Sequence, residues 1–143
     1  MPDSKNEPKT KPTDASAIDY ITAIAPENRR ADSLALLDLH VDITGQQPVM
    51  WGDAIIGFDR YTSINGKKQA SDWPLAGFSP RKAQMTVYLM AGFSDRPDLL
   101  EGLGRFKTSV ACLYFNRLSD LNLDKLKTLI KWSYETAKLR YKA

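Results

Sequence analysis

The sequence predicts a single α+β domain, in which a central antiparallel sheet of about five strands is packed by N-terminal helices and a long C-terminal helix. Helical spacing of apolar residues is confined mainly to the two ends of the chain, and short apolar runs separated by turn signals fill residues 48–115. Helices that enclose a block of hairpin-linked strands are typical of an α+β domain, whereas a parallel sheet needs strands and helices that alternate.

The chain length fits one domain of ordinary size. The 143 residues lie near the commonest domain length, and 43% of them are apolar. Residues 1–12 contain three lysines and three prolines and, beyond Met1, no aliphatic side chain. We therefore expect a disordered N-terminal tail over residues 1–12 and the folded domain over residues 13–143.

Two helices are predicted near the N-terminus. Thr13 or Asp14 can cap a short first helix, and Pro26 fits the first turn of a second helix that runs to about Thr44. Gly45 stands where a C-cap glycine belongs. The expected apolar side chains are Ile18, Ile21 and Ile24 in the first helix and Leu34, Leu37 and Val41 in the second.

Strands are expected from residue 49 to residue 115. Asn65–Gly66 is the strongest turn signal, because both residues tolerate positive φ, and Ser79–Pro80 marks a further turn. The clearest alternation of side-chain character covers residues 83–91. The predicted strands are Val49–Trp51, 54–58 with an extension through 59–62, 69–77, 83–91 and 107–115.

Two further helices are predicted after the strand at residues 83–91. A short one covers residues 97–103, with Asp95 as its cap, and a long one begins after the cap Asn122 and runs to about Tyr141. The apolar stripe of the long helix is Leu123, Leu126, Ile130, Tyr134, Ala137 and Tyr141.

Charge and cysteine content narrow the class of protein. The net charge is +3, but residues 13–44 carry six acidic residues against two arginines, and residues 124–143 carry six basic residues against two acidic ones. These opposite charges would let the two terminal helical regions lie near one another. The single cysteine fits a reducing compartment, and no apolar run is long enough for a membrane span. We expect a cytoplasmic protein without membrane contact, and the low net charge argues against a nucleic-acid partner.

Several short motifs follow one another through the strand block and continue to residue 120. They are Met50-Trp51-Gly52-Asp53, Gly57-Phe58, Asp72-Trp73-Pro74, Gly77-Phe78-Ser79-Pro80-Arg81-Lys82, Thr86-Val87-Tyr88-Leu89-Met90, Gly102-Leu103-Gly104-Arg105-Phe106-Lys107-Thr108, Cys112-Leu113-Tyr114 and Leu118-Ser119-Asp120. In this order and spacing they resemble the YdhG-like domain family. The resemblance implies helices packed on one antiparallel sheet. The family is largely a domain of unknown function, and some members have been described as frataxin-like iron chaperones, so the resemblance implies iron handling as one possibility.

The residues that nucleophilic catalysis would need are scarce. The only histidine is His40, which lies on a predicted helix and is expected to be a partly exposed surface residue. Cys112 lies among apolar residues of a predicted strand, which favours a buried, inert thiol. The chain also lacks a phosphate-binding loop, a dinucleotide-binding fingerprint and a Cys-x-x-Cys motif. We therefore expect a protein that is not an enzyme.

A loose iron site is the alternative hypothesis for function. Carboxylates suit hard cations, and Asp32, Asp38 and Asp42 lie on the second predicted helix. The competing interpretation is a solvated acidic helix face.

The leading hypothesis is a ligand-binding or chaperone-like domain with an aromatic and cationic cleft, which would take a small anionic or planar ligand. Under the competing interpretation the aromatic side chains pack in the core and the cations are solvated. A homodimer formed through an exposed strand edge is a further expectation. The predicted ligand-binding residues are Trp51, Tyr61, Trp73, Arg81, Lys82, Tyr88 and Lys107.

Overall fold

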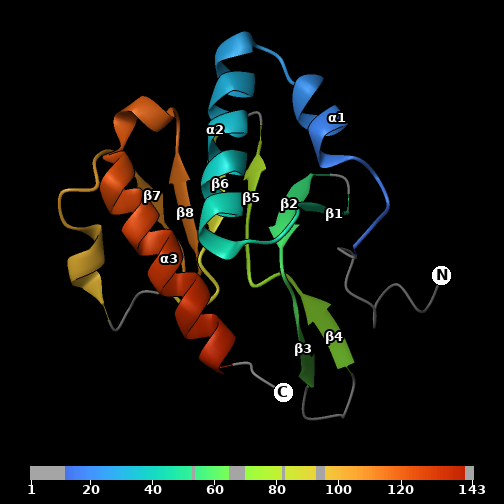
Figure 1. Ribbon diagram of the computed structural model, residues 1–143. Helices are drawn as coiled ribbons and strands as arrows, with labels where there is room; N and C mark the ends of the chain where they lie inside the picture. Colours follow the sequence, from blue (N-terminus) through green and yellow to red (C-terminus); the bar gives the residue numbers. More distant parts are fainter. Residues whose placement is uncertain (1–11, 53, 65–69, 82, 93–95, 141–143) are drawn as a thin grey trace.

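The computed structural model describes residues 12–52, 54–64, 70–81, 83–92 and 96–140. The predicted tail, apart from its last residue Pro12, lies outside the described residues, as do the Asn65–Gly66 turn, the cap Asp95 and the ligand candidate Lys82. Within the described residues the chain has the predicted α+β architecture, with helices toward both ends and antiparallel strands between them (Figure 1).

The strands form a six-stranded antiparallel sheet and a separate two-stranded ribbon. The sheet has the order β1-β2-β5-β6-β8-β7, so β1 and β7 are its edges, and the ribbon pairs β3 with β4. The strands are β1 (Val49–Trp51), β2 (Ile55–Phe58), β3 (Tyr61–Ile64), β4 (Ala70–Trp73), β5 (Ala76–Pro80), β6 (Met85–Tyr88), β7 (Lys107–Thr108) and β8 (Cys112–Phe115).

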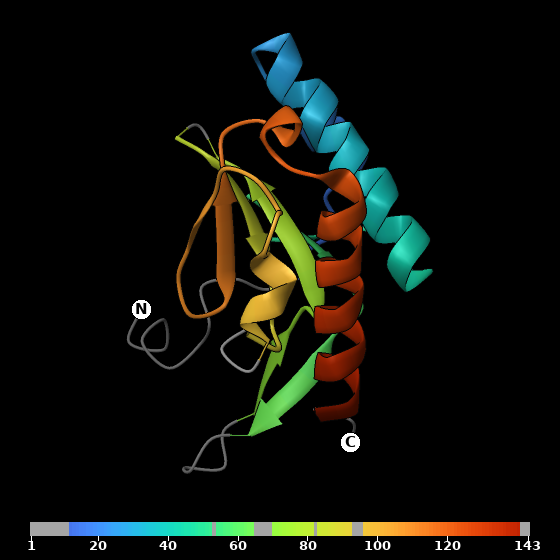
Figure 2. The ribbon, with the colours of Figure 1, turned by 90° about the vertical axis from the view of Figure 1, so that its left-hand side faces the viewer.

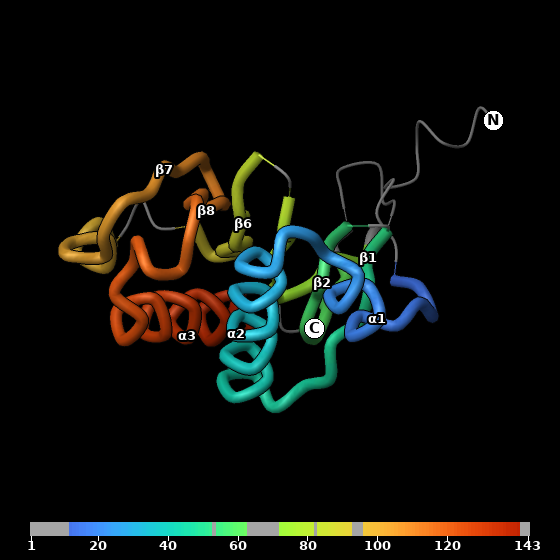
Figure 3. The backbone as a smooth tube through the Cα atoms, turned by 90° about the horizontal axis from the view of Figure 1, so that it is seen from above, coloured from blue at the N-terminus to red at the C-terminus, as the bar shows by residue number. Residues whose placement is uncertain are grey.

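Helices α2 (Glu27–Thr44) and α3 (Leu123–Arg140) lie on the same face of the six-stranded sheet (Figures 2 and 3). The short α1 (Ala17–Thr22) lies beside α2, at the β1 side of the sheet. Two 3₁₀ turns, η2 (Pro97–Leu100) and η3 (Leu118–Asp120), flank β7 and β8 in the chain. The predicted short helix at 97–103 is therefore a shorter 3₁₀ segment.

The ends of the long helices follow the predicted chemistry. Gly45 ends α2 with φ 68°, and its N–H donates to the carbonyl of Val41 at 2.8 Å. Asn122 caps α3, because its side-chain oxygen accepts from the N–H of Lys125 at 3.1 Å. The opposite charges of the two helices also meet, since Lys127 Nζ of α3 lies 3.0 Å from Asp42 Oδ2 of α2.

The core fills the space between the sheet and the two long helices. Alternate side chains of the central strands, among them Phe58, Phe78 and Val87, are fully buried there. Directly opposite residues of paired strands share a face. The intervening positions, such as Tyr88 and Tyr114, therefore lie on the face turned away from α2 and α3, which we call the outer face.

The predicted helix stripes are partly wrong. Ile18 and Leu123 are 48% and 53% exposed, so neither belongs to the core. In α2 the fully buried positions include Leu36 and His40, whereas the expected Leu34 and Val41 are only half-buried. The physical reason is that α2 contacts α1, α3 and the sheet, so a broader part of its surface is covered than one apolar stripe indicates.

Three predicted strands are interrupted. The single strand 69–77 is two strands in different sheets, β4 and β5, with Pro74 and Leu75 between them. Asp59 has φ 61°, which ends β2 and prevents the predicted extension through residue 62. Residues 107–115 form a hairpin of β7 and β8, and Ser79–Pro80 is no turn but the end of β5, paired with β6.

Candidate functional site

The predicted aromatic and cationic residues that the structure describes come from separate parts of the sheet and the ribbon. Trp51 lies on the edge strand β1 and is 1% exposed. Its indole ring packs over Gly57 of β2, where a Cβ would lie 2.5 Å from the ring. Trp51 and Lys107 lie on the two edge strands, β1 and β7, which are five strand spacings apart. At about 4.8 Å per spacing, these edges are about 24 Å apart. Trp51 therefore belongs to the packing of the sheet edge.

Tyr61 and Trp73 form a second, separate location. They are directly opposite each other at the start of the β3–β4 ribbon, which extends away from the six-stranded sheet (Figure 1). Trp73 is 37% exposed and Tyr61 is half-buried. This aromatic pair closes the base of the ribbon, as cross-strand pairs of large side chains commonly do.

Arg81 and Tyr88 are brought together by the β5–β6 hairpin. A guanidinium nitrogen of Arg81 donates to the Tyr88 hydroxyl at 3.3 Å. This hydrogen bond raises the pKa of Arg81 above its ordinary value. Arg81 is exposed and Tyr88 is half-buried, so the pair forms part of the outer face.

Lys107 lies on the same outer face, at the opposite sheet edge from Trp51. It stands directly opposite Tyr114 of β8, and Tyr114 in turn stands opposite Thr86 of β6. Lys107 is exposed, and Tyr114 is half-buried with its hydroxyl 3.1 Å from Ser109 Oγ. The sheet therefore places Lys107 directly opposite Tyr114 on one face, and the Tyr114 hydroxyl is itself held by a hydrogen bond.

A cleft of about 530 Å³ opens at this edge, and we call it the β7 cleft. Its lining comes from four segments: residues 104–107, Ala83 and Gln84 before β6, the end of β8 with Asn116, and Asp120 of η3. We call the β8 part of the lining, Tyr114 and Phe115, the floor of the cleft. The lining residues are Ala83, Gln84, Gly104, Arg105, Phe106, Lys107, Tyr114, Phe115, Asn116 and Asp120.

Gly104 fixes the wall of the β7 cleft. It has φ 129°, and a Cβ at this position would clash with the carbonyl oxygen of Asp120. The close approach lets the N–H of Arg105 donate to that oxygen at 3.0 Å and the N–H of Asn122 donate to the carbonyl of Leu103 at 2.7 Å. Only glycine adopts this conformation without strain and also leaves the space. The segment that carries Arg105 and Lys107 is thus held against η3.

The electrostatics of the β7 cleft favour an anion. Within the described ranges, neither Arg105 nor Lys107 forms an ion pair. The one acid in the lining, Asp120, accepts a hydrogen bond from the N–H of Arg117 at 3.1 Å. Gln84 and Asn116 add side-chain amides to the lining. Two cations and two amides around an aromatic floor are the groups that bind a small planar anion.

Of the predicted ligand residues that the structure describes, only Lys107 lines the β7 cleft. The neighbouring Arg105 belongs to the same cationic run of the sequence, but Gln84, Tyr114 and Asn116 carried no signal of their own. Their shared location follows from the register of β6, β8 and β7, which pairs residues far apart in the chain.

The three carboxylates of the iron hypothesis lie in different surroundings. Asp32 is 8% exposed and accepts from Arg117 Nε at 2.8 Å and from the N–H of Leu118 at 3.1 Å. Asp38 and Asp42 both line a pocket beside α2, but only Asp42 of the two forms an ion pair among the described residues, with Lys127. Among the described residues no group of three acidic, histidine or cysteine side chains is arranged to hold a metal ion.

His40 is a correction to the sequence-based expectation of a partly exposed residue. It is fully buried, and its ring lies 5.0 Å from the ring of Phe58 and 5.2 Å from that of Phe78. Nδ1 lies 2.8 Å from the carbonyl of Leu36, while Nε2 has no partner among the described residues. Burial lowers the pKa of His40 to about 4. The imidazole is therefore neutral and packs as an aromatic core residue.

Cys112 and His40 lie on opposite faces of the sheet. Cys112 stands opposite Tyr88 on the outer face. It is half-buried, whereas the sequence predicted a fully buried thiol. His40 lies on the helix-covered face. A nucleophile and its base must be within hydrogen-bond reach, and the sheet separates these two side chains.

Comparisons with known proteins place no relative beside this chain: no family model, no curated protein and no solved structure matches it. The resemblance to the YdhG-like domain family stays a prediction. Among the described residues, none of the helices has the length and apolar character that a membrane span requires.

Proposed function

We propose that this chain is a non-enzymatic binding protein, which holds a small, planar anion in the β7 cleft. The observation that carries the proposal is the pair of cations in the cleft lining: within the described part of the chain, neither Arg105 nor Lys107 has an ionic partner. A bound carboxylate or phosphate would supply that partner.

The floor of the cleft supports a planar ligand. Tyr114 is half-buried and tied to Ser109, so its ring offers a fixed surface at little entropic cost. Lys107 stands beside it on the same face. The volume of about 530 Å³ lies within the usual range for small-molecule sites.

The test is calorimetric titration of the full chain with benzoate and, separately, with inorganic phosphate. We expect saturable binding of benzoate that weakens at least about tenfold in the double variant Arg105→Gln plus Lys107→Gln, because hydrogen bonds to charged groups contribute about 1.5–3 kcal/mol. A matched double variant, Arg60→Gln plus Lys131→Gln, removes two exposed cations outside the cleft and should bind as the wild type does. Equal weakening in both double variants would show that only net charge matters and would overturn the proposal.

The predicted self-association through a strand edge is a separate proposal. β7, a two-residue edge strand, is the candidate edge. Sedimentation of the full chain across a concentration range tests it, and a constant monomer mass would exclude it.

A further inference from the structure

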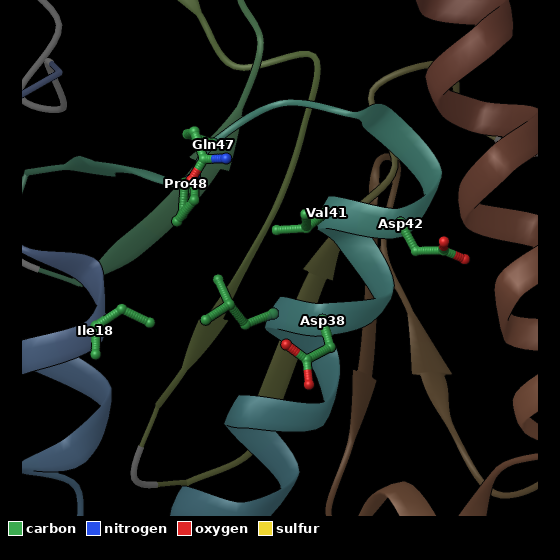
Figure 4. A pocket seen from close by; sticks show the side chains of 7 residues that line it. Ile18, Asp38, Val41, Asp42, Gln47 and Pro48 are labelled. Atoms are coloured by element: carbon green, nitrogen blue, oxygen red, sulfur yellow. The ribbon is translucent and has the colours of Figure 1, made fainter.

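A second pocket lies between α1, α2 and the segment before β1, and we call it the α1–α2 groove. It has a volume of about 380 Å³ and lies on the opposite side of α2 from α3 (Figure 4). Aliphatic or ring carbons make up most of its wall, and one amide and two carboxylates complete the lining. The residues are Ile18, Leu37, Asp38, Val41, Asp42, Gln47 and Pro48.

The apolar wall comes from both helices. Ile18 projects from α1 toward α2, and Val41 projects from α2 toward Pro48 (Figure 4). Ile18 is 48% exposed and Val41 is half-buried, so aliphatic surface remains in contact with water in the groove. Covering such surface with an alkyl chain would contribute about 25 cal/mol for each Å² removed from water.

The two carboxylates of the groove differ in their partners. Asp42 Oδ2 lies 3.0 Å from Lys127 Nζ, and its side chain points toward α3, away from the groove (Figure 4). Asp38 is exposed at the rim and forms no ion pair within the described ranges. The groove thus combines an aliphatic wall with a single uncompensated negative charge.

The charge around the groove also selects a cation. Residues 13–44, which include α1 and α2, carry six acids against two arginines. An anion of the kind proposed for the β7 cleft would be repelled here. An alkyl chain that ends in an ammonium group matches both the aliphatic wall and the free carboxylate.

We propose that the α1–α2 groove binds a small aliphatic amine in its ammonium form, with the alkyl chain against Ile18 and Val41 and the ammonium group on Asp38. The inference is independent of the β7 cleft, since the two pockets share no lining residue. If no binding is found at one of the two sites, the proposal for the other site is unaffected.

The test is an NMR titration of the ¹⁵N-labelled full chain with hexylammonium chloride, compared with hexanoate and with hexanol at equal ionic strength. We expect saturating amide shifts at Ile18, Val41 and Gln47 with hexylammonium, and much weaker responses to the other two probes. Asp38→Asn should weaken hexylammonium binding about two- to fivefold, as expected for an exposed ion pair.

Asp42→Asn is the matched control. Asp42 lies four residues after Asp38 and carries the same charge, but its carboxylate already pairs with Lys127. It should change the affinity less than Asp38→Asn does. An equal effect of the two variants, equal binding of hexanol, or no saturating shift in the groove would each overturn the proposal. The wild-type comparison of the three probes keeps the test decisive if a variant fails to fold.

Discussion

Lys107 and Tyr114 stand directly opposite each other in the β7–β8 ladder, so a cationic and an aromatic side chain share the outer face at one edge of the sheet. The neighbouring Arg105 enters the same cleft because Gly104 lets the chain approach η3 closely. The β7 cleft therefore depends on one strand register and one glycine.

Gly104→Ala should destabilise the protein strongly. The variant would combine a φ of 129° with a clash against the carbonyl oxygen of Asp120, so we expect a loss of about 3 kcal/mol or more in the free energy of unfolding. Urea denaturation measures this loss. Gly45→Ala is the matched control, because Gly45 also has positive φ but has no atom within 4 Å of an added Cβ. It should cost about 1–2 kcal/mol. Equal costs would contradict the clash.

Asp32→Ala should cost about 2–3 kcal/mol, because it leaves the Leu118 N–H and the Arg117 guanidinium without their acceptor. This cost is smaller than that of breaking a fully buried ion pair, since the Arg117 side chain is 38% exposed and water can solvate its guanidinium. Asp42→Ala breaks an exposed pair and should cost less than about 1 kcal/mol. Chemical denaturation of both variants measures these changes in the free energy of unfolding. An Asp32→Ala variant as stable as the wild type would refute a structural role for this carboxylate.

His40 should make stability depend on pH between about 6.5 and 4. The unfolded chain protonates its histidine near pH 6.5, whereas burial lowers the pKa in the folded protein to about 4. The contribution is therefore complete above pH 6.5 and is lost as the pH falls toward 4, by about 3 kcal/mol in total. His40→Leu removes the titrating group. As the pH falls from about 6.5 to 4, the wild type should lose unfolding free energy relative to the variant. A difference between the two proteins that does not change with pH would contradict the burial of His40.

The C-terminus of α2 and the N-terminus of α3 were predictable because they depend on local chemistry. Gly45 and Asn122 act at the positions where their backbone and side-chain preferences place them. The alternation around Val87 also predicts a strand, and β6 lies there, although Thr86 on its outer face is buried as well. These signals need no knowledge of the rest of the chain.

The break before β5 and the burial of His40 were not predictable in this way. Residues 69–77 were predicted as one strand, but Ala70–Trp73 pairs with β3 and Ala76–Pro80 pairs with β2 and β6. A histidine in a helix is classed as polar, yet the rings of Phe58 and Phe78 surround this one. Both outcomes depend on partners that are distant in sequence.

The candidate site was predictable only in its residue types. Cations beside aromatic side chains indicated an anion site, and Lys107 does line a cleft. The remaining predicted residues that the structure describes lie at the sheet edge, in the ribbon and in the β5–β6 hairpin, because proximity along the outer face follows from strand order and not from sequence spacing.

An NMR titration of the ¹⁵N-labelled full chain with benzoate locates the proposed anion site without relying on a variant. We expect saturating amide shifts at Gln84, Lys107 and Tyr114, three residues of the β7 cleft that come from separate parts of the chain. The amides of Trp51 and Trp73 should stay unchanged. Saturating shifts confined to those tryptophans, or none at the three cleft residues, would show that the β7 cleft does not bind the anion.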